Sequence, residues 1–583
     1  PKSNGAEKSL QHAIVTMPSS KVKLCVHPEP RSPDDSEAPR SRLTFSFEHT
    51  EPITLGIELA HTYLLLLAGS CILRLLPHRA RERPHRDDTQ SANQSGLLKM
   101  VDVEIQRVDM RIALPEGVKL FLGVRRLHLH HSPSVLGSIA MESVVGAARL
   151  PTQSPSDERF SEVLSLRDWK IQLHKSKGEE LPSVQVHADS AVFNVPFSFQ
   201  VHDIIEGTSV AVKATKQLLH DTLLQRDGIA INAKKMSPLR LPNITLQMRM
   251  LVLEAEDDPL ETRLGLIYKV GKEESRSRLE RDAAFAQRVS NKASRESHVS
   301  LDREDVEPGS DSASLRNAGL PILRLAEDAR RRLDAFNASA WVRRVAKARA
   351  SQEAREDRFG KQILGRFPKS FKGHSWPVAV KSRRAVAPLF RSTMSSVHLK
   401  IGQPHFGTEN ARDFINRHGD PIPAGLEFSI FVPMHIEWKM SEWRINLRDY
   451  PLPLLHIPLS SSGEAPSWEI STDICIAEQL GGTESTRHVP ACIIHNICPA
   501  DCDAAYVIQV PKVALPTKFF GSPKINLHSG SPVRLTWGQS LQPTISDMVR
   551  VFDGFSSPPH DPSPKLGFWD KVRETGHFVS ALD

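Results

Sequence analysis

The stretch FSIFVPMHIEWKMSEWRINLRDYPLPLLHIP, from Phe428 to Pro458, decides the fold because its first half alternates apolar and polar side chains without interruption. Alternation with a period of two predicts a β-strand with one apolar face. Counted from Leu426, this strand has about 15 residues and extends roughly 50 Å, whereas an average strand has about five or six residues. Its apolar face consists of Phe428, Ile430, Val432, Met434, Ile436, Trp438 and Met440.

The alternation changes phase at Ser441 and Glu442. Beyond them the apolar residues occupy odd positions, namely Trp443, Ile445 and Leu447. A strand that keeps one apolar face through such a change needs a bulge or a tight turn. The sequence DYPLP at 449–453 then ends the strand, because proline cannot donate a hydrogen bond to a neighbouring strand.

Comparable alternation lies on both sides of a helical middle. Long strands with few glycine turns favour an extended, curved, open sheet over a closed barrel or a sandwich, so the predicted fold class is α+β. Long amphipathic helices are expected around 202–226, 258–292 and 320–364. The expected segments are a poorly assigned stretch at 1–96, a β-segment at 97–257, a helical basic segment at 258–377 with a linker at 296–317, and a β-domain at 395–583.

Composition is that of a globular protein, with 39% hydrophobic and 25% charged residues in 583. Six cysteines and no secretory leader at the start indicate a reducing, cytosol-facing environment. The net charge of +7 is concentrated in 330–400, which holds 18 Lys and Arg against 4 Asp and Glu. Such a segment suits anionic lipid headgroups, or nucleic acid in a nuclear binding protein, or it is a solvated helix surface.

The apolar stretch from Ile53 to Leu76 has two interpretations. Its charge-free part, Leu59 to Leu73, is shorter than the roughly 20 residues that a membrane span requires. The favoured interpretation is a buried strand pair or an interfacial segment, and the alternative is a transmembrane helix.

No signature of a known catalytic site occurs in the sequence. The dinucleotide-binding, Walker, zincin and nucleophile-elbow motifs are all absent, so we expect no enzyme and no cofactor. Two clusters raise the question of a metal. His128, His130 and His131 are interpreted as a polar strand face, and Cys492, His495, Cys498 and Cys502 as ordinary reduced residues, because neither has the spacing of a standard zinc site.

Two stretches resemble the fungal members of the Hobbit family. They are WKMSEWRINLRDYPLPLLHIP at 438–458 and DPSPKLGFWDKVR at 561–573, the second holding the signature after which the GFWDK-motif domain is named. EDDPLETRLGLIYKVGKEESRSRLERDAAF at 256–285 and FNASAWVRRV at 336–345 are similar to the preceding helical domain. The matching motif residues are Trp443, Arg448, Asp449, Tyr450, Pro451, Pro453, Gly567, Phe568, Trp569, Asp570 and Lys571.

The resemblance implies an open, taco-like, mainly antiparallel repeating β-groove. It further implies that the groove carries phospholipids between the endoplasmic reticulum and the plasma membrane at contact sites, with a mitochondrion-associated location as the alternative. Adaptor proteins at contact sites would be further partners. Because the family continues past its GFWDK motif and carries an N-terminal membrane anchor, we expect this chain to be an interior section.

On this reading, the apolar face of the opening strand becomes the floor of the groove. The floor would be lined by Phe428, Ile430, Val432, Ile436, Trp438 and Met440. The alternative is that this face packs against a covering helix.

Overall fold

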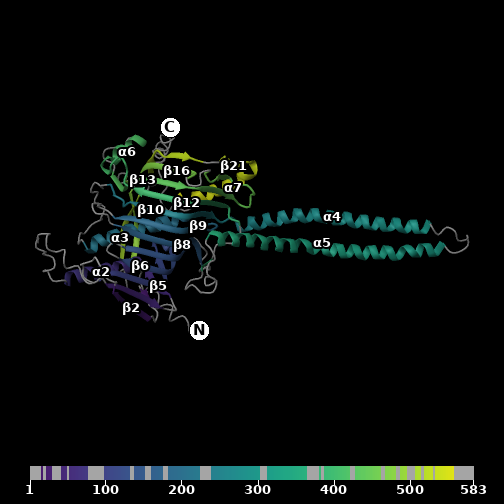
Figure 1. The fold of residues 1–583 in the computed structure, drawn as a ribbon, viewed down its shortest axis with the longest axis horizontal. Helices are drawn as coiled ribbons and strands as arrows, with labels where there is room; N and C mark the ends of the chain where they lie inside the picture. The colour runs from purple at the N-terminus through teal and green to yellow at the C-terminus, as the bar shows by residue number, and fades with distance from the viewer. Residues whose placement is uncertain are drawn as a thin grey trace. The chain divides into compact units, whose positions relative to one another are not determined.

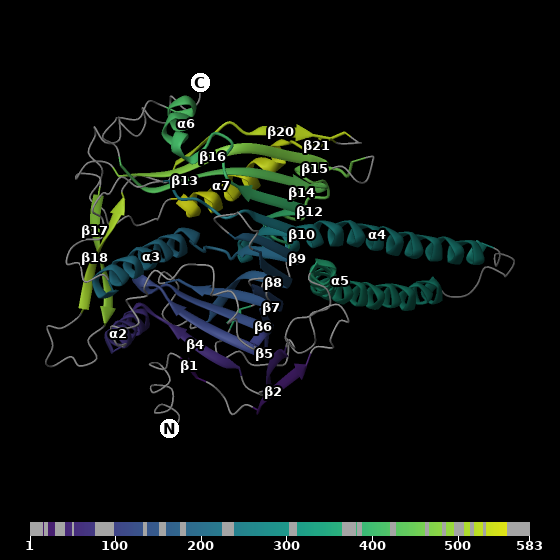
Figure 2. The same ribbon diagram turned by 60° about the vertical axis from the view of Figure 1, so that its left-hand side comes forward.

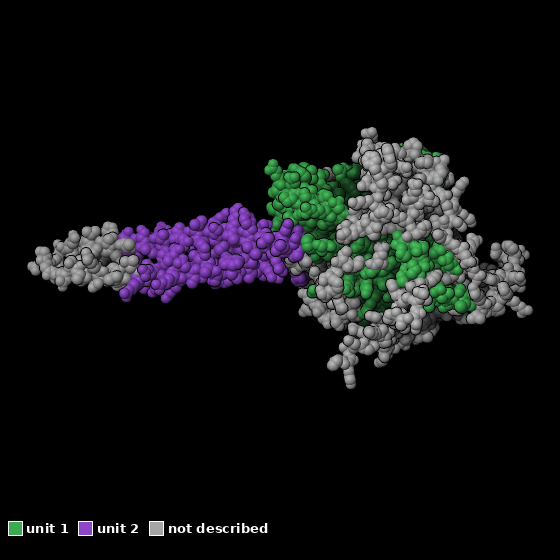
Figure 3. Space-filling model, turned by 180° about the vertical axis from the view of Figure 1, so that it is seen from behind, with its two compact units in different colours: residues 1–256, 366–383, 388–583 green, residues 257–365, 384–387 purple. Residues whose placement is uncertain are grey.

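In the computed structural model, the part of the chain that can be described falls into eighteen ranges. They are residues 15–16, 21–28, 41–48, 52–75, 98–131, 137–150, 159–174, 182–223, 238–301, 312–363, 380–381, 387–419, 427–460, 466–480, 486–494, 506–513, 518–528 and 532–556. These residues divide into two compact units (Figure 3). Unit 1 comprises 1–256, 366–383 and 388–583, and unit 2 comprises 257–365 and 384–387.

Unit 2 is a pair of long helices, α4 (Pro259–Leu301) and α5 (Ser312–Ile363), that lie side by side (Figure 1). The helix α4 begins where Asp-Pro predicts, because the Asp258 carboxylate accepts a hydrogen bond from the Leu260 backbone N–H at 2.7 Å. Glu274, 5% exposed, joins the helices through Arg344 of α5 at 2.7 Å. The linker expected at 296–317 is wrong at both ends, since helix continues to Leu301 and resumes at Ser312; residues 302–311 lie outside the described ranges.

Unit 1 is built on one open sheet, to which all its described strands except the β17–β18 hairpin belong. The strands are β1 (Val15–Thr16), β2 (Lys21–Pro28), β3 (Ser41–Glu48), β4 (Ile53–Ile57), β5 (Leu98–Ala113), β6 (Lys119–His131), β7 (Gly137–Arg149), β8 (Phe160–His174), β9 (Ser183–Val195), β10 (Ile244–Ala255), β11 (Val380–Lys381), β12 (Phe390–Gly402), β13 (Glu427–Met440), β14 (Glu442–Leu447), β15 (Leu455–Ile457), β16 (Trp468–Leu480), β19 (Lys518–Gly521), β20 (Lys524–Leu527) and β21 (Arg534–Leu535).

The central strands follow one another as β5, β6, β7, β8, β9, β10, β12, β13 and β16 (Figure 2). Most neighbours are antiparallel, as predicted. The β9–β10 pair is parallel because the helix α3 (Val201–Leu223), expected at 202–226, crosses between them. The pairing of β10 with β12 joins the β-patterns before and after the helical segment in one sheet. No described pairing connects the two outer edges, so the sheet is an open β-groove.

The described part of the stretch 53–76 is not a strand pair. It forms β4, which pairs with β5, followed by the 17-residue helix α2 (Leu59–Leu75). Among the described helices, none combines the length and the apolar character that crossing a membrane requires.

A transverse line crosses the sheet where each strand changes phase, and we call it the crease. In β6, β8 and β12 a residue there adopts positive φ, namely Arg126 at 45°, Asp168 at 49° and Ser396 at 49°. A residue in this region bends a strand and restarts its pleat. In these three strands and in the others that meet the crease, the apolar residues on its two sides are three positions apart: Ile105 and Val108, Val124 and Leu127, Met141 and Val144, Leu166 and Trp169, Ala188 and Ala191, Met248 and Leu251, Met394 and Val397, Met440 and Trp443.

The phase change predicted at Ser441 lies on this crease. The strand β13 ends at Met440 and β14 begins at Glu442, while the Ser441 N–H donates to the Ser395 carbonyl at 3.0 Å. All the paired residues flanking the crease pack in two clusters, so one apolar face continues across it. The bulge predicted at Ser441 is therefore part of the crease, which also crosses the neighbouring strands.

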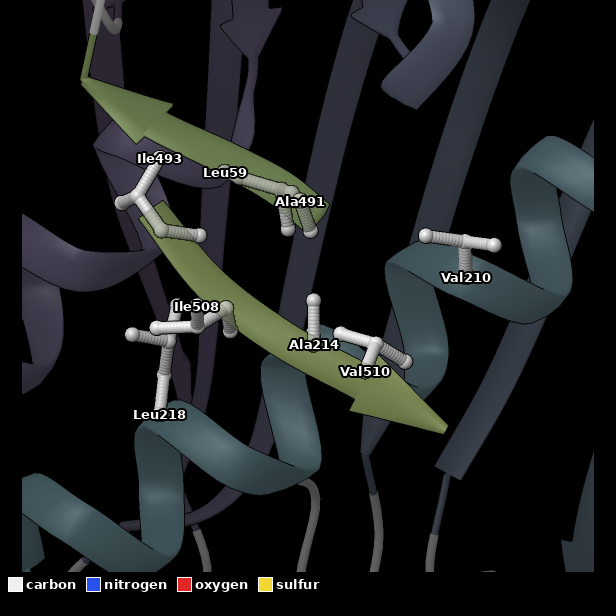
Figure 4. Close-up of a cluster of buried hydrophobic side chains, with 8 residues drawn as sticks. All are labelled: Leu59, Val210, Ala214, Leu218, Ala491, Ile493, Ile508 and Val510. Atoms are coloured by element: carbon white, nitrogen blue, oxygen red, sulfur yellow. The ribbon is translucent and has the colours of Figure 1, made fainter. Parts of the chain in front are cut away.

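The helices α2 and α3 of unit 1 pack against a hairpin that does not belong to the main sheet. Residues of α2 and α3 form a buried cluster with β17 (Thr486–Ile494) and β18 (Tyr506–Val513) (Figure 4). Its members are Leu59, Val210, Ala214, Leu218, Ala491, Ile493, Ile508 and Val510. These helices therefore bury apolar side chains against each other and a separate hairpin, while Val201 and Ile204 of α3 also pack against a cluster that contains Ala148 of β7.

Candidate functional site

One register row of the sheet is apolar across ten strands, and we call it the apolar row. Its residues are Val103, Leu129, Ile139, Ile171, Val186, Leu246, Leu399, Trp438, Ile470 and Ile525. Residues opposite one another in register share a face of the sheet. At about 4.8 Å per strand, the row spans roughly 43 Å perpendicular to the strands.

The neighbouring row points to the other face and is polar throughout, and we call it the polar row. Its residues are Asp102, His130, Ser138, Gln172, Gln185, Thr245, Lys400, Glu437, Ser471 and Lys524. Each of these residues is a sequence neighbour of a member of the apolar row. This half of the sheet therefore has one continuous apolar face and one polar face.

A second apolar row follows the far side of the crease. It consists of Ile53, Val108, Val124, Val144, Leu166, Ala191, Leu251, Met394, Trp443 and Ile457. Most of these side chains are buried; Ala191, for example, is 0% exposed and Met394 3%. The apolar face is thus continuous along the crease as well as across it.

The residues predicted for the groove floor fall on this face where they are described. Met440 is 1% exposed, and Trp438 packs against Trp468 with ring centroids 5.2 Å apart. Trp468 also contacts Trp443 across the crease at 5.5 Å. Val432 and Ile436 are partly exposed. The side chains of Phe428 and Ile430 lie outside what the structure describes.

A covering helix does exist, but it packs on the opposite face. The helix α6 (Ala411–His418) buries Phe414 and Ile415 with Phe431 of β13 and Cys475 of β16. Phe431 is an odd-numbered residue of β13. None of the described helices contributes a side chain to the cluster that contains Trp438.

The indole of Trp438 carries an unused hydrogen-bond donor. Its Nε1 atom is buried and has no acceptor within the described part of the chain. By contrast, Trp443 Nε1 donates to Ser392 Oγ at 2.9 Å. A buried donor without an acceptor costs about 1–3 kcal/mol.

Residues of the family motif that follow β14 form hydrogen bonds to the helix α7 (Gln542–Ser556) and to the residue Ser540 just before it. Arg448, at φ 46°, donates to Asp547 at 2.8 Å and to Thr544 at 3.3 Å, both on α7. The Tyr450 hydroxyl donates to the Ser540 carbonyl at 2.6 Å. The ladder ends before Asp449, Pro451 and Pro453, as predicted. Gly567, Phe568, Trp569, Asp570 and Lys571 lie outside the described ranges.

Two histidines of β6 each lie near a different carboxylate of β5. His130 Nδ1 contacts Asp102, and His128 lies 3.7 Å from Glu104. Cys492 is in β17, whereas His495, Cys498 and Cys502 lie outside the described ranges.

An ion pair at the crease makes the stability of the fold depend on pH. Arg249 donates two hydrogen bonds to the Asp189 carboxylate, at 2.6 and 3.1 Å. These bonds lower the pKa of the Asp189 carboxyl from its ordinary value. A carboxyl whose pKa is lowered by folding stabilises the fold above its unfolded pKa of about 3.9, and this contribution is lost as the pH falls through the lower, folded pKa.

We therefore expect Asp189→Asn to lower the melting temperature at pH 7 and to have less effect as the pH falls below about 4. The expected cost at pH 7 is at most about 1 kcal/mol, because both partners are partly exposed. Thermal melts of both proteins between pH 7 and pH 3 test this. A difference in melting temperature that stayed constant over this range would contradict it.

The chain is similar to known proteins of one family. A model described as the Hobbit/FMP27/BTLP2 family matches residues 73–578. Protein FMP27, mitochondrial, of Saccharomyces cerevisiae is 28% identical over an alignment of 500 residues that covers 74% of this chain and 19% of that protein. UPF0648 protein C3H5.09c of Schizosaccharomyces pombe is 27% identical over 457 residues, 67% of this chain and 16% of that protein.

A relative outside the fungi matches over a shorter range. Protein hobbit of Drosophila melanogaster is 29% identical over 158 residues, which are 27% of this chain and 6% of that protein. The chain thus spans less than a fifth of the length of each of these three relatives. No solved structure matches.

Proposed function

The chain belongs to the Hobbit/FMP27/BTLP2 family, and we propose that it is a section of a bridge-like lipid transfer protein whose apolar groove conducts phospholipids between membranes. The observation that supports this most directly is the apolar row, which continues across ten strands beside a polar row on the other face. A surface for one small ligand would need a pocket only a few strands wide.

Transfer energetics explain the use of such a surface. Moving an acyl chain into water costs about 0.8 kcal/mol per CH₂, so exposing the two chains of a phospholipid costs on the order of 20 kcal/mol. Contact with an unbroken apolar face removes most of this cost. Because apolar contact has no preferred direction, a lipid can slide from strand to strand without breaking hydrogen bonds.

The path of the lipid is then set by the register of the sheet. Lipids move perpendicular to the strands, along the apolar row, rather than along any one strand. Each strand crosses the floor once, and the contribution of β13 is Phe428, Ile430, Val432, Ile436, Trp438 and Met440. The headgroups of the lipids remain in water.

The membranes involved are part of the same proposal. We place the full-length protein at contact sites between the endoplasmic reticulum and the plasma membrane, with adaptor proteins as further partners and no catalytic step. One relative is named mitochondrial, which supports a mitochondrion-associated location as the alternative. Imaging of the tagged full-length protein against markers of the three membranes separates the two.

The test of the function is the identification of bound lipid. The purified chain is analysed by native mass spectrometry, and released lipids are identified after denaturation. We expect phospholipids with two acyl chains, in more than one headgroup class. A chain that carries no lipid and takes none up from phosphatidylcholine vesicles contradicts the proposal, and salt-sensitive DNA binding by that lipid-free chain would favour a nucleic-acid-binding protein instead.

A further inference from the structure

A cluster of two histidines and an aspartate lies on the polar face of the sheet. His435 in β13 is directly opposite Asp473 in β16, and its Nδ1 atom is 2.9 Å from Asp473 Oδ1. His405, in the turn after β12, brings its Nδ1 atom to 3.2 Å from the same oxygen. These three residues come from segments about 30 to 70 positions apart in the chain and belong to neither apolar row.

The arrangement has the dimensions of a metal site. One ligand atom from each residue lies within 4.8 Å of the other two. In a tetrahedral zinc site with bonds of about 2.0–2.1 Å, ligand atoms are about 3.3 Å apart. The two nitrogen–oxygen distances, 2.9 and 3.2 Å, are close to that value. Two imidazoles and one carboxylate are a common ligand set for a divalent first-row metal.

We propose that His405, His435 and Asp473 bind a divalent transition metal of the Zn²⁺ type. The second shell agrees with this assignment. A metal-bound histidine usually directs its other nitrogen to a carboxylate, and His435 Nε2 lies 3.7 Å from Glu437 Oε1 and 3.5 Å from Ser471 Oγ. With Nδ1 on the metal, the Nε2–H of His435 would face these two oxygens.

The metal ties the turn after β12 to two strands. The His405 side chain is 71% exposed, so the site is open to solvent and leaves the metal a fourth position for water. The next residue, Phe406, stacks on Phe414 of α6 at 4.2 Å. Metal binding therefore orders the turn between β12 and α6. It also strengthens the packing of α6 on the polar face of the sheet, against β13 and β16.

The test uses the full chain, freed of metal with a chelator and titrated with Zn²⁺ by calorimetry. We expect one site, weakened at least about 100-fold by His405→Ala and about tenfold by Glu437→Gln, since second-shell partners typically contribute 10–100-fold. His130→Ala is the matched control. It removes a histidine paired with Asp102 on the same face, where no third ligand is found among the described residues, and leaves Zn²⁺ affinity unchanged.

Titration with Co²⁺ distinguishes this site from the cysteines at 492–502. We expect visible absorption of a nitrogen–oxygen site that His405→Ala abolishes, without the near-ultraviolet band of thiolate ligation. If Zn²⁺ and Co²⁺ bind the wild type no better than His405→Ala, or only with a thiolate band, the proposal is wrong. The three residues would then form a hydrogen-bonded cluster only.

Discussion

Replacing Leu246 and Ile436 with glutamate is expected to lower the phospholipid bound per chain at least about tenfold. Both residues lie on the apolar face, and Leu246 stands in the middle of the apolar row. A carboxylate in contact with an acyl chain costs several kcal/mol, and each 1.4 kcal/mol is a tenfold change in occupancy. The measurement is the molar ratio of extracted phospholipid to protein.

The control adds the same charge to the other face. Gln247 follows Leu246 in β10 and Gln185 precedes Val186 in β9, and both glutamines are exposed. Gln247→Glu with Gln185→Glu therefore adds two carboxylates, and we expect it to leave lipid content unchanged. Circular dichroism establishes that both double variants are folded. A folded Leu246→Glu/Ile436→Glu protein with normal lipid content would show that the apolar row does not hold lipid.

The two-faced character of the sheet could be predicted from the sequence because it depends on alternation alone. The strand β13, the end of β14 before Pro451, the helix α3 and the start of α4 after Asp258 follow from period, proline and capping. Each of these signals is local. The ends of the predicted linker were wrong because a polar, charged sequence such as 296–301 can also continue a helix.

The apolar row could not be derived from the sequence, because it depends on which strand pairs with which. Ile436 and Trp438 were predicted from one strand, whereas Leu246 and Leu399 face them only through the register of β10, β12 and β13. The crease is visible in the amino-acid sequence as two apolar residues three positions apart in each strand that meets it. One of these steps was predicted from the sequence, at Ser441, but the line that joins it to the others exists only in the folded sheet.

The cluster of His405, His435 and Asp473 was missed for the same reason. His435 falls on the polar side of an alternating strand, where it looks like any solvent-facing residue. Asp473 becomes its neighbour through the pairing of β13 with β16, and His405 through the turn that follows β12. Sites assembled from three distant segments carry no motif spacing, so only the structure can bring them together.

Trp468→Ala is expected to destabilise the crease more than any substitution on the polar face. Trp468 is 7% exposed and contacts both Trp438 and Trp443, so its removal leaves a cavity between the two halves of the sheet. Replacing a buried tryptophan with alanine costs about 3–5 kcal/mol. Hydrogen exchange of the most protected amides in β12, β13 and β16 should accelerate about 100- to 5,000-fold.

The matched control is Trp537→Ala, which removes the same side chain where it is 72% exposed. Exposed substitutions usually change stability by less than about 0.5 kcal/mol, so exchange in these strands should be nearly unchanged. Equal acceleration by both variants would mean that the sheet does not depend on the packing of the three tryptophans. Acceleration confined to Trp468→Ala, and reaching both β13 and β14, would show that the crease opens as one unit, because Trp468 contacts Trp438 in β13 and Trp443 in β14.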